Sequence, residues 1–316
     1  MPPCVMSPPE SDALARAIAR AANCEWAAVE ERSFVGEEFT LRPLVPVRDR
    51  DVCVVQTLAP SAAAPITARL VRLLFLLAAL RDAGARSRIA VIPYLAYARQ
   101  ERRGESGDPV HTRYVAELLQ AAGMTHLIAL DVHDLAAIDN AFRVPVEHLT
   151  ARPVFIEWLA EQTLSEPLAV ASPDIGGIKR AQSFREHLER RLGQAVELLF
   201  IEKRRAAGHL SAGHQIVGQA EGRHVVLIDD LCATGETLMR AAAALNQAGA
   251  LRVSAAVTHV ASAAGLRALC ADPHLSQVLV TDSALTPESQ DAAPGKLCVI
   301  PCASLFAPAL AQIGPR

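Results

Sequence analysis

The sequence predicts an α/β protein of two domains, each a mainly parallel β-sheet flanked by helices. Short apolar runs rich in β-branched residues alternate with longer stretches of helical periodicity, and this order is typical of parallel strands joined by helices. The alternation stops near residue 150 and then starts again. A chain of 316 residues is also long enough for two α/β domains of ordinary size.

The first half begins with a Pro-rich start, which we expect to lack regular structure, and a predicted helix over 12–22. Helical periodicity predicts further helices over 66–83 and 112–122, and each is followed by a glycine of the kind that commonly ends a helix. A polar segment, 96–108, precedes the last of these helices. Strands covered on both faces are apolar throughout, so we predict buried strands at 52–56, 89–93 and 126–130.

The second half repeats this layout. Apolar runs and helical periodicity predict helices over 178–192 and 238–248 and strands at 168–171, 197–201, 225–228, 253–258, 277–280 and 297–300. A long polar stretch without clear periodicity follows the second of these strands. We place the boundary near 150–155, which predicts domains of 1–152 and 153–316, and we expect the last helix to pack back on the first domain.

The composition excludes several classes of protein. The chain is 51% apolar and 21% charged with a formal net charge of −3, so it is globular and has no overall charge that would attract nucleic acid or an anionic membrane. The longest apolar helix candidate, 70–80, contains Arg72 and is too short to cross a bilayer. The start has no signal-peptide pattern, so we expect a cytoplasmic protein. Seven cysteines without a CxxC spacing indicate neither disulfides nor a zinc site, and Cys232 is either a reactive thiol or a bystander.

The most informative segment is VVLIDDLCATGETL, at 225–238. An apolar strand ends in two acids, Asp229 and Asp230, and the run TGET then leads into a helix. Ligands of open α/β sheets bind where parallel strands end. Carboxylates accept hydrogen bonds from sugar hydroxyls, and backbone N–H groups at a helix start bind phosphate. The segment therefore has the chemistry to bind a sugar phosphate, although similar residues also occur in acidic loops that only cap a helix.

Two polar clusters follow strands of the first half. Arg99, Gln100 and Glu101 begin a charged run, and arginines at such a site can bind phosphates in bidentate fashion. His133 follows the strand at 126–130 beside carboxylates, in the manner of a metal-ligating histidine. Taken alone, the charged run is more often an exposed surface loop, and a lone histidine is more often an ordinary polar residue.

A third cluster is the segment SPDIGGIKR, which follows the strand at 168–171. Asp174 precedes Gly176 and Gly177, and a predicted helix begins directly after them. Glycines let a ligand approach the backbone closely, and the helix start supplies N–H donors, so a pyrophosphate site is favoured. The alternative is a strand–helix turn that uses glycine only for its geometry.

A fourth cluster follows the strand at 197–201. Lys203, Arg204 and Arg205 open the long polar stretch, whose small residues and glycines are typical of a mobile lid. Cations on such a lid would stabilise the charge of transferring phosphates. The alternative is a disordered basic loop.

Together these segments resemble the ribose-phosphate pyrophosphokinase family, also called phosphoribosyl pyrophosphate synthetase. Members typically show a PYARQDR-like segment, a strand-end Asp-x-His, SPDxGGxKR, a KRR-bearing loop and an Asp-Asp…Thr loop, in that order. This chain has YARQERR, DVH, SPDIGGIKR, EKRR and DDLCATGET in the same order, over most of its length. The resemblance implies two phosphoribosyltransferase-like domains of type I.

The resemblance also implies an activity and its partners. The enzyme would be a ribose-phosphate diphosphokinase, which transfers the diphosphoryl group of ATP to the anomeric hydroxyl of ribose 5-phosphate and requires Mg²⁺. The products would be phosphoribosyl pyrophosphate and AMP. A homo-oligomer built from dimers, with a hexamer as one form, is implied as well.

The roles implied for individual residues fall into four groups. From the lid, the catalytic residues would be Lys203 and Arg205. Ribose 5-phosphate would be bound by Asp229, Asp230, Ala233, Thr234, Gly235, Glu236 and Thr237. The diphosphate would lie beside Asp174, Gly176 and Gly177, with Mg²⁺ near His133 and Asp174. ATP would be bound by Arg99, Gln100 and Glu101 and, from a neighbouring subunit, by Phe34, Gly36, Glu37 and Glu38.

Two departures from the family pattern leave alternatives open. Ala233 stands where the family usually has an Asp: affinity would differ if that side chain helps catalysis or ribose binding, and little would change if only its backbone N–H matters. The segment DLAAIDNAF replaces a Gln-rich, aromatic stretch, so we expect the usual regulatory site for phosphate and ADP to be absent. One alternative is a non-catalytic homologue that binds a synthetase, but such a protein would be expected to lose the lid cations. The other is a phosphoribosyltransferase that uses the same 229–237 loop, which would leave the first half of the chain unexplained.

Overall fold

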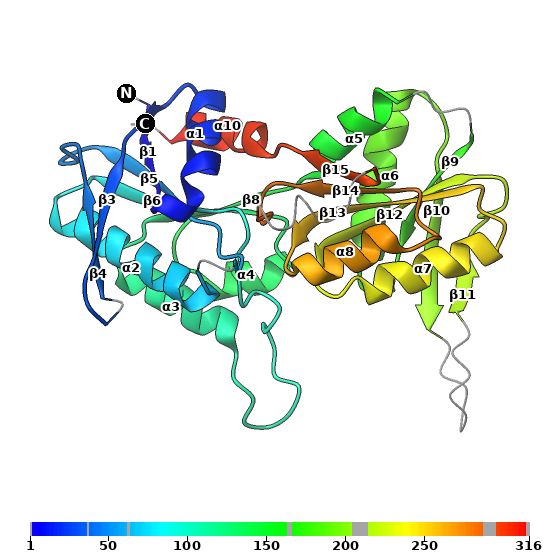
Figure 1. The fold of residues 1–316 in the computed structure, drawn as a ribbon, viewed down its shortest axis with the longest axis horizontal. Coiled ribbons are helices and arrows are strands. Elements are labelled where there is room, and N and C mark those ends of the chain that lie inside the picture. The colour runs from blue at the N-terminus through cyan, green and yellow to red at the C-terminus, as the bar shows by residue number, and fades with distance from the viewer. Residues whose placement is uncertain are drawn as a thin grey trace. The chain divides into compact units, whose positions relative to one another are not determined.

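The computed structural model describes residues 2–36, 38–61, 64–162, 166–203, 214–286 and 295–313. The chain divides into two compact units, and both are drawn in Figure 1. Unit 1 holds the described residues up to Ala151 and those from Cys302 onward, and unit 2 is Arg152–Pro301. Among the helices of the described part of the chain, none is long and apolar enough to cross a membrane.

Unit 1 is built on a six-stranded sheet in which every neighbouring pair is parallel. In spatial order its strands are β2 (Glu25–Trp26), β1 (Cys4–Met6), β5 (Asp51–Val55), β6 (Ser87–Ile92), β7 (His126–Leu130) and β8 (Val146–Leu149). Figure 1 shows helices on both faces: on one, α1 (Asp12–Ala21) and α10 (Ala303–Gln312), which contact each other, and on the other α2 (Ile66–Asp82) and α3 (His111–Ala121). A one-turn η1 (Pro9–Ser11) precedes α1, and α4 (Leu135–Ala141) follows β7.

The local sequence explains this arrangement. Strand β5 reads DVCVV and is buried throughout, because helices cover the sheet on both faces. Helix α2 places Leu73, Leu76, Leu77 and Leu80 in the core, at the three- and four-residue spacing of one helix face. Gly123 closes α3 with φ of +102°, a backbone conformation that favours glycine.

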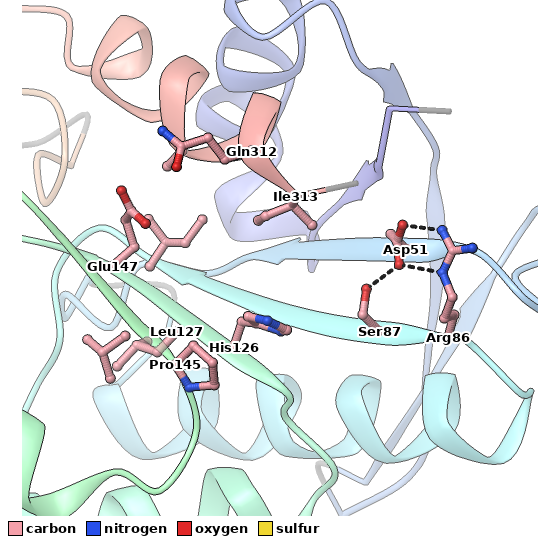
Figure 2. Close-up of a pocket in the computed structure, with 12 residues that line it drawn as sticks. Asp51, Arg86, Ser87, His126, Leu127, Pro145, Glu147, Gln312 and Ile313 are labelled. Atoms are coloured by element: carbon pink, nitrogen blue, oxygen red, sulfur yellow. Dashed lines mark hydrogen bonds and ion pairs between the residues drawn. The ribbon is translucent and has the colours of Figure 1, made fainter. Parts of the chain in front are cut away.

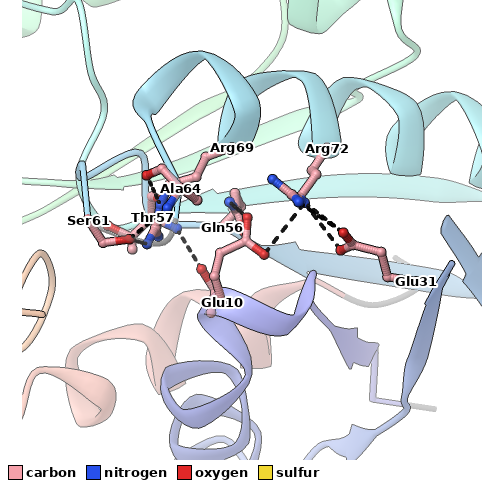
Figure 3. Close-up of polar contacts among 9 residues, drawn as sticks. Glu10, Glu31, Gln56, Thr57, Ser61, Ala64, Arg69 and Arg72 are labelled. Atoms are coloured by element: carbon pink, nitrogen blue, oxygen red, sulfur yellow. Dashed lines mark hydrogen bonds and ion pairs between the residues drawn. The ribbon is translucent and has the colours of Figure 1, made fainter. Parts of the chain in front are cut away.

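A hairpin of β3 (Val29–Ser33) and β4 (Phe39–Pro43) is anchored to unit 1 by buried charged groups (Figure 3). Arg72 on α2 binds both carboxylate oxygens of Glu31 on β3, with Nη2 2.9 Å from Oε1 and Nε 3.2 Å from Oε2. Its Nε also lies 3.9 Å from Glu10 Oε2, and its guanidinium lies 5.0 Å from the centre of the Phe39 ring. These three charged side chains are at most 19% exposed, so one cation balances two largely buried carboxylates.

A neighbouring arginine on α2 holds the segment that follows β5. The guanidinium of Arg69 donates to the Thr57 carbonyl at 3.3 Å and to Ser61 Oγ at 3.0 Å. Burial lowers the pKa of Arg69, which is 5% exposed. The carbonyl and hydroxyl contacts satisfy the donors of a guanidinium that is shielded from water.

Replacing Arg72 with Ala is expected to destabilise unit 1 by about 3 kcal/mol, because Glu10 and Glu31 would be left without their shared cation. Scanning calorimetry should show an unfolding midpoint lower by several degrees. Arg42→Ala is the control: Arg42 pairs with Glu30 on the same hairpin but is 63% exposed, and such pairs contribute little to stability. Equal losses in the two variants would contradict the importance of the buried pair.

Unit 2 is built on a seven-stranded sheet that is parallel except at one edge. In spatial order its strands are β11 (His214–Val217), β10 (Glu197–Lys203), β9 (Leu168–Ser172), β12 (His224–Cys232), β13 (Arg252–Val260), β14 (Gln277–Thr281) and β15 (Leu297–Ile300). The antiparallel strand is β11, which pairs with β10. In Figure 1 the sheet lies between α5 (Arg152–Ala160) with α6 (Ile178–Leu192) and α7 (Glu236–Gln247) with α8 (Ala263–Ala271).

The predicted α/β fold class is confirmed, and two local predictions are wrong. The Pro-rich start contains a buried strand, β1, which obtains its hydrogen bonds from β2 and β5 rather than from its own neighbours in sequence. The two acids of the opening motif do not follow a strand that ends at residue 228, because β12 continues through them to Cys232. The carboxylates therefore stand on the last part of a strand, where the sheet itself restrains their backbone.

Candidate functional site

The acidic pair lies at the carboxyl end of β12, beside the first turn of α6. Arg180 Nη1 is 3.3 Å from Asp229 Oδ1, and Arg180 Nη2 is 3.3 Å from Asp230 Oδ2. Asp229 Oδ1 also accepts the backbone N–H of Asp230 at 2.9 Å. The side chains of Asp229 and Asp230 are 21% and 10% exposed, so both are largely shielded from water but not enclosed.

Burial and the neighbouring carboxylate both affect the charge of Asp229. Burial, and after it the charge of Asp230, raises the pKa of Asp229 above that of an ordinary aspartate. Cys232, two residues further along β12, is buried, and burial followed by the charge of Asp229 raises its pKa to about 12. A thiol is nucleophilic only as the thiolate, so Cys232 is a bystander in this loop.

The loop after β12 leads into the N-terminus of α7, which is a feature common to phosphate sites. Gly235 caps the helix with φ of +77°, and Thr234 and Glu236 beside it are exposed. The backbone N–H groups of the first helical turn have no partner within the helix, and they carry its positive dipole end. The hydroxyl of Thr234 accepts the N–H of Glu236 at 3.4 Å. The loop thus offers N–H and hydroxyl donors to an anion.

This loop rests against a second glycine that the sequence did not single out. A Cβ atom added at Gly265, in the first turn of α8, would lie 2.0 Å from the carbonyl oxygen of Ala233 and 3.1 Å from Thr234 Cα. Real Cβ atoms do not approach a carbonyl oxygen so closely, so any side chain at Gly265 would displace the loop. Gly265 therefore sets the position of the 233–237 segment.

The segment after β9 forms a tight turn that leads into α6. The hydroxyl of Ser172 donates to the Asp174 carbonyl at 2.6 Å, and Gly177 N–H donates to Asp174 Oδ1 at 3.1 Å. A Cβ at Gly177 would lie 2.6 Å from Ser172 Oγ, so any side chain here would displace that hydroxyl. Asp174, Ile175 and Gly176 are exposed. Strands β9 and β12 are neighbours, so this turn and the acidic pair lie at the same edge of the sheet.

In unit 1, two strand ends bring predicted site residues together. Glu101, whose side chain is 9% exposed, has its Oε1 3.7 Å from His133 Nδ1, and its buried Oε2 has no hydrogen-bond partner. Arg99 and Gln100 are exposed at the start of the long loop that Figure 1 shows between β6 and α3. The backbone is strained at Tyr97 (φ +65°), close to this loop.

The hairpin in unit 1 presents its tip to solvent. Phe34 is 56% exposed, and its N–H donates to the Glu38 carbonyl at 2.7 Å across a turn that contains Gly36 with φ of +85°. Val35 beside it is 99% exposed. The ring of Phe34 is available to another molecule, because no described residue of unit 1 covers it.

Three predicted positions lie partly or wholly outside the described residues. Glu37 and Arg205 are outside them, and so is the side chain of Lys203, whose backbone ends β10 and pairs with His214 of β11. The roles predicted for these three residues therefore stay predictions.

A cavity of about 580 Å³ lies at the opposite edge of the unit 1 sheet, at the amino ends of β5–β8 (Figure 2). Its polar lining includes Asp51, Arg86, Ser87, His126, Glu147 and Gln312. Arg86 and Ser87 both bind the Asp51 carboxylate, and Arg86, followed by Ser87, lowers the pKa of this aspartate despite the opposing effect of burial. None of the predicted site residues that the structure describes lines this cavity. Ligands of parallel sheets bind at the carboxyl ends of strands, so we assign the site to those ends instead.

Known proteins resemble this chain over nearly its whole length. Residues 4–123 match the N-terminal domain of ribose phosphate pyrophosphokinase, and residues 154–271 match the phosphoribosyl transferase domain. The chain is 36% identical over 276 residues to a ribose-phosphate pyrophosphokinase of Granulibacter bethesdensis, covering 87% of this chain and 86% of that protein. It is 34% identical over 301 residues to the Caldanaerobacter subterraneus protein of the same name, covering 95% and 91%. The crystal structure of phosphoribosylpyrophosphate synthetase from Mycobacterium smegmatis superposes with a TM-score of 0.86 at 28% identity, covering 98% of both chains.

Proposed function

The chain belongs to the ribose-phosphate pyrophosphokinase family, and we propose that it transfers the diphosphoryl group of ATP to the anomeric hydroxyl of ribose 5-phosphate. The hydroxyl oxygen bonds to the β-phosphorus, and the bond from that phosphorus to the α,β-bridging oxygen breaks. AMP leaves with the bridging oxygen, and the hydroxyl proton is released to solvent. The product is phosphoribosyl pyrophosphate. The observation that carries this proposal is the acidic pair Asp229–Asp230 followed directly by the α7 N-terminus, because a sugar phosphate needs acceptors for its hydroxyls and donors for its phosphate.

Each group of predicted residues has one task in the proposed reaction. Asp229 and Asp230 accept hydrogen bonds from ribose hydroxyls, and the 233–237 loop binds the 5-phosphate. The turn of Asp174, Gly176 and Gly177 binds the diphosphate. In unit 1, Arg99, Gln100 and Glu101 bind ATP, and Phe34, Gly36, Glu37 and Glu38 bind it from a neighbouring subunit. Diphosphoryl transfer needs positioning and neutralisation of charge more than covalent help from the protein, and Lys203 and Arg205 neutralise charge as it develops.

The residues present fit Mg²⁺. Asp174 is exposed, and its Oδ2 has no hydrogen-bond partner among the described residues. The buried, unpartnered Oε2 of Glu101 beside His133 is a second oxygen suited to a cation. The described residues contain no cluster of three or more metal-ligating side chains, which accords with Mg²⁺ that takes few protein groups and completes its shell with water and phosphates. When bound, Mg²⁺ neutralises phosphate charge.

A homo-oligomer of this chain is part of the proposal, because the family resemblance places the exposed Phe34 in the ATP site of a neighbouring subunit. Its size, whether a dimer or a hexamer, stays a prediction, as do a cytoplasmic location and the absence of a nucleic-acid partner. Sedimentation of the purified protein measures the size directly.

The proposed reaction is tested by incubating the protein with ribose 5-phosphate, ATP and MgCl₂ and measuring AMP. We expect AMP and phosphoribosyl pyrophosphate in equal amounts, no AMP without ribose 5-phosphate, and none after EDTA removes Mg²⁺. Folded protein that forms no AMP would rule the reaction out in favour of a non-catalytic homologue. Diphosphate released from phosphoribosyl pyrophosphate only when a nucleobase is added would instead support a phosphoribosyltransferase.

A further inference from the structure

Arg180 holds an unusual position in unit 2. It is the third residue of α6, yet its guanidinium reaches the strand beside that helix and contacts both Asp229 and Asp230 at 3.3 Å. A cation in the first turn of a helix is disfavoured by the helix dipole, which is positive there. The contacts with two carboxylates offset this cost, so the position of Arg180 is set by the acidic pair and not by helix stability.

The geometry also explains how two adjacent strand residues act together. Successive side chains of a strand point to opposite faces of the sheet. One guanidinium is a planar fork with several N–H donors, and each of its two terminal nitrogens here contacts a different carboxylate. Lysine, with a single charged nitrogen, has no such fork. Arg180 therefore restrains the two carboxylates relative to each other.

We propose that Arg180 is a positioning residue for ribose 5-phosphate, which holds the carboxylates of Asp229 and Asp230 in place relative to each other. This inference rests on the proposed function, because it takes the acidic pair as the acceptor of the ribose hydroxyls. Arg180 itself touches no reacting atom in this account. It acts through the two aspartates.

The charge of Arg180 adds to this restraint by opposing protonation of the pair. An ionised carboxylate only accepts hydrogen bonds, whereas a protonated one has to place its own proton and loses an acceptor position. Burial and mutual repulsion favour protonation of one member of the pair, and the charge of Arg180 opposes it. A guanidinium keeps its charge throughout the physiological pH range. The other titratable groups among the described residues at the carboxyl ends of these strands and in the helix turns beside them include Asp174, Lys179, Cys232, Glu236, His259 and Asp282.

The same helix supplies a matched control. Arg185 has the same residue type and nearly the same exposure as Arg180, 26% against 27%, but it pairs with Glu186 and Glu189 on α6 itself. A general loss of helix stability would appear in Arg185→Gln as much as in Arg180→Gln. An effect on the acidic pair would appear only in the second variant.

The kinetic test compares Arg180→Gln, Arg180→Lys and Arg185→Gln with the unaltered enzyme. Arg180→Gln is expected to raise the KM for ribose 5-phosphate about ten- to a hundredfold, as expected for loss of a hydrogen bond between charged groups, and to leave the KM for ATP within about twofold. The acid limb of kcat/KM for ribose 5-phosphate should move to higher pH, so that raising the pH recovers part of the activity. Arg180→Lys restores the charge and thus the pH limb, but not the full affinity. Arg185→Gln changes neither.

A second measurement keeps this inference separate from the proposed function. Carboxyl ¹³C NMR of aspartate-labelled protein without substrate, assigned with Asp229→Asn, should show the pair titrating about one pH unit or more higher in Arg180→Gln. If the unaltered enzyme forms no AMP, the proposed reaction is wrong. The titration still tests whether Arg180 opposes protonation of Asp229 and Asp230. Unchanged titration in Arg180→Gln, or equal rises in the KM values for both substrates, would overturn the role of Arg180.

Discussion

Replacing Lys203 with Ala is expected to lower kcat for AMP formation by about 100- to 1,000-fold, which is typical for loss of one donor that stabilises developing charge. Lys203 ends β10 at the carboxyl edge of the unit 2 sheet, the edge that also carries the acidic pair. An interaction made only in the transition state lowers kcat and kcat/KM equally. The KM values for ATP and ribose 5-phosphate should therefore stay within about threefold of those of the unaltered enzyme.

The measurement is initial AMP release at saturating substrate, with Lys296→Ala as the control. Lys296 also lies in unit 2, but its Nζ donates to the Asp272 carbonyl at 2.7 Å, beside the start of β15 and away from the acidic pair. We expect its removal to leave kcat unchanged. A large rise in KM with unchanged kcat for Lys203→Ala would assign this lysine to substrate binding instead of to the reaction itself.

Gly265→Ala is expected to weaken ribose 5-phosphate binding at least about tenfold and to destabilise unit 2 by about 2 kcal/mol, the cost of overpacking a filled site. The added methyl group would overlap the Ala233 carbonyl, only 2.0 Å away, and the backbone of the 233–237 loop would have to move. In an ordinary helix the same substitution is stabilising, because glycine is a poor helix former. At Gly265 the close approach of two backbone segments makes the same substitution destabilising.

Thermal unfolding and the KM for ribose 5-phosphate measure the two expected effects. Ala264→Ser is the control, since it adds one atom to the neighbouring, exposed position of the same helix and should change neither quantity. The KM for ATP should also be unchanged in Gly265→Ala. If Gly265→Ala is as stable as the unaltered protein and binds ribose 5-phosphate equally well, the loop does not depend on this contact.

The elements predicted best were those with long, regular patterns. The helix at 178–192 and the strand at 126–130 coincide with α6 (Ile178–Leu192) and β7 (His126–Leu130). The missed elements are short or polar. Strand β1 has three residues, and β3 and β4 have mostly exposed or half-buried side chains, so neither shows the apolar run of a buried strand. Strand β1 forms because β2 and β5, which are distant in sequence, pair with it, and no local pattern records this pairing.

The same contrast holds at the site. The acidic pair, the turn at Asp174 and the loop at 233–237 were predicted because each carries its chemistry in consecutive residues. Arg180 belongs to the segment SPDIGGIKR, but no role was predicted for it. A cation in the first turn of a helix is nevertheless unfavourable, and this local signal marks the residue as unusual. Gly265 gave no signal, since a lone glycine in a predicted helix has several explanations.

The sequence by itself determined the α/β class and the order of the chemical segments, because helix and strand periods and the residues of a binding loop are properties of consecutive positions. Only the tertiary structure decided which of these segments touch. Parallel strands β9 and β12 align their carboxyl ends, so a helix that starts after one strand can direct Arg180 to the acids of the other. Gly265 lies far along the chain from the loop at 233–237. It supports that loop only because α8 packs beside it. Contacts between backbone segments far apart along the chain depend on the sheet order, and local sequence carries no record of it.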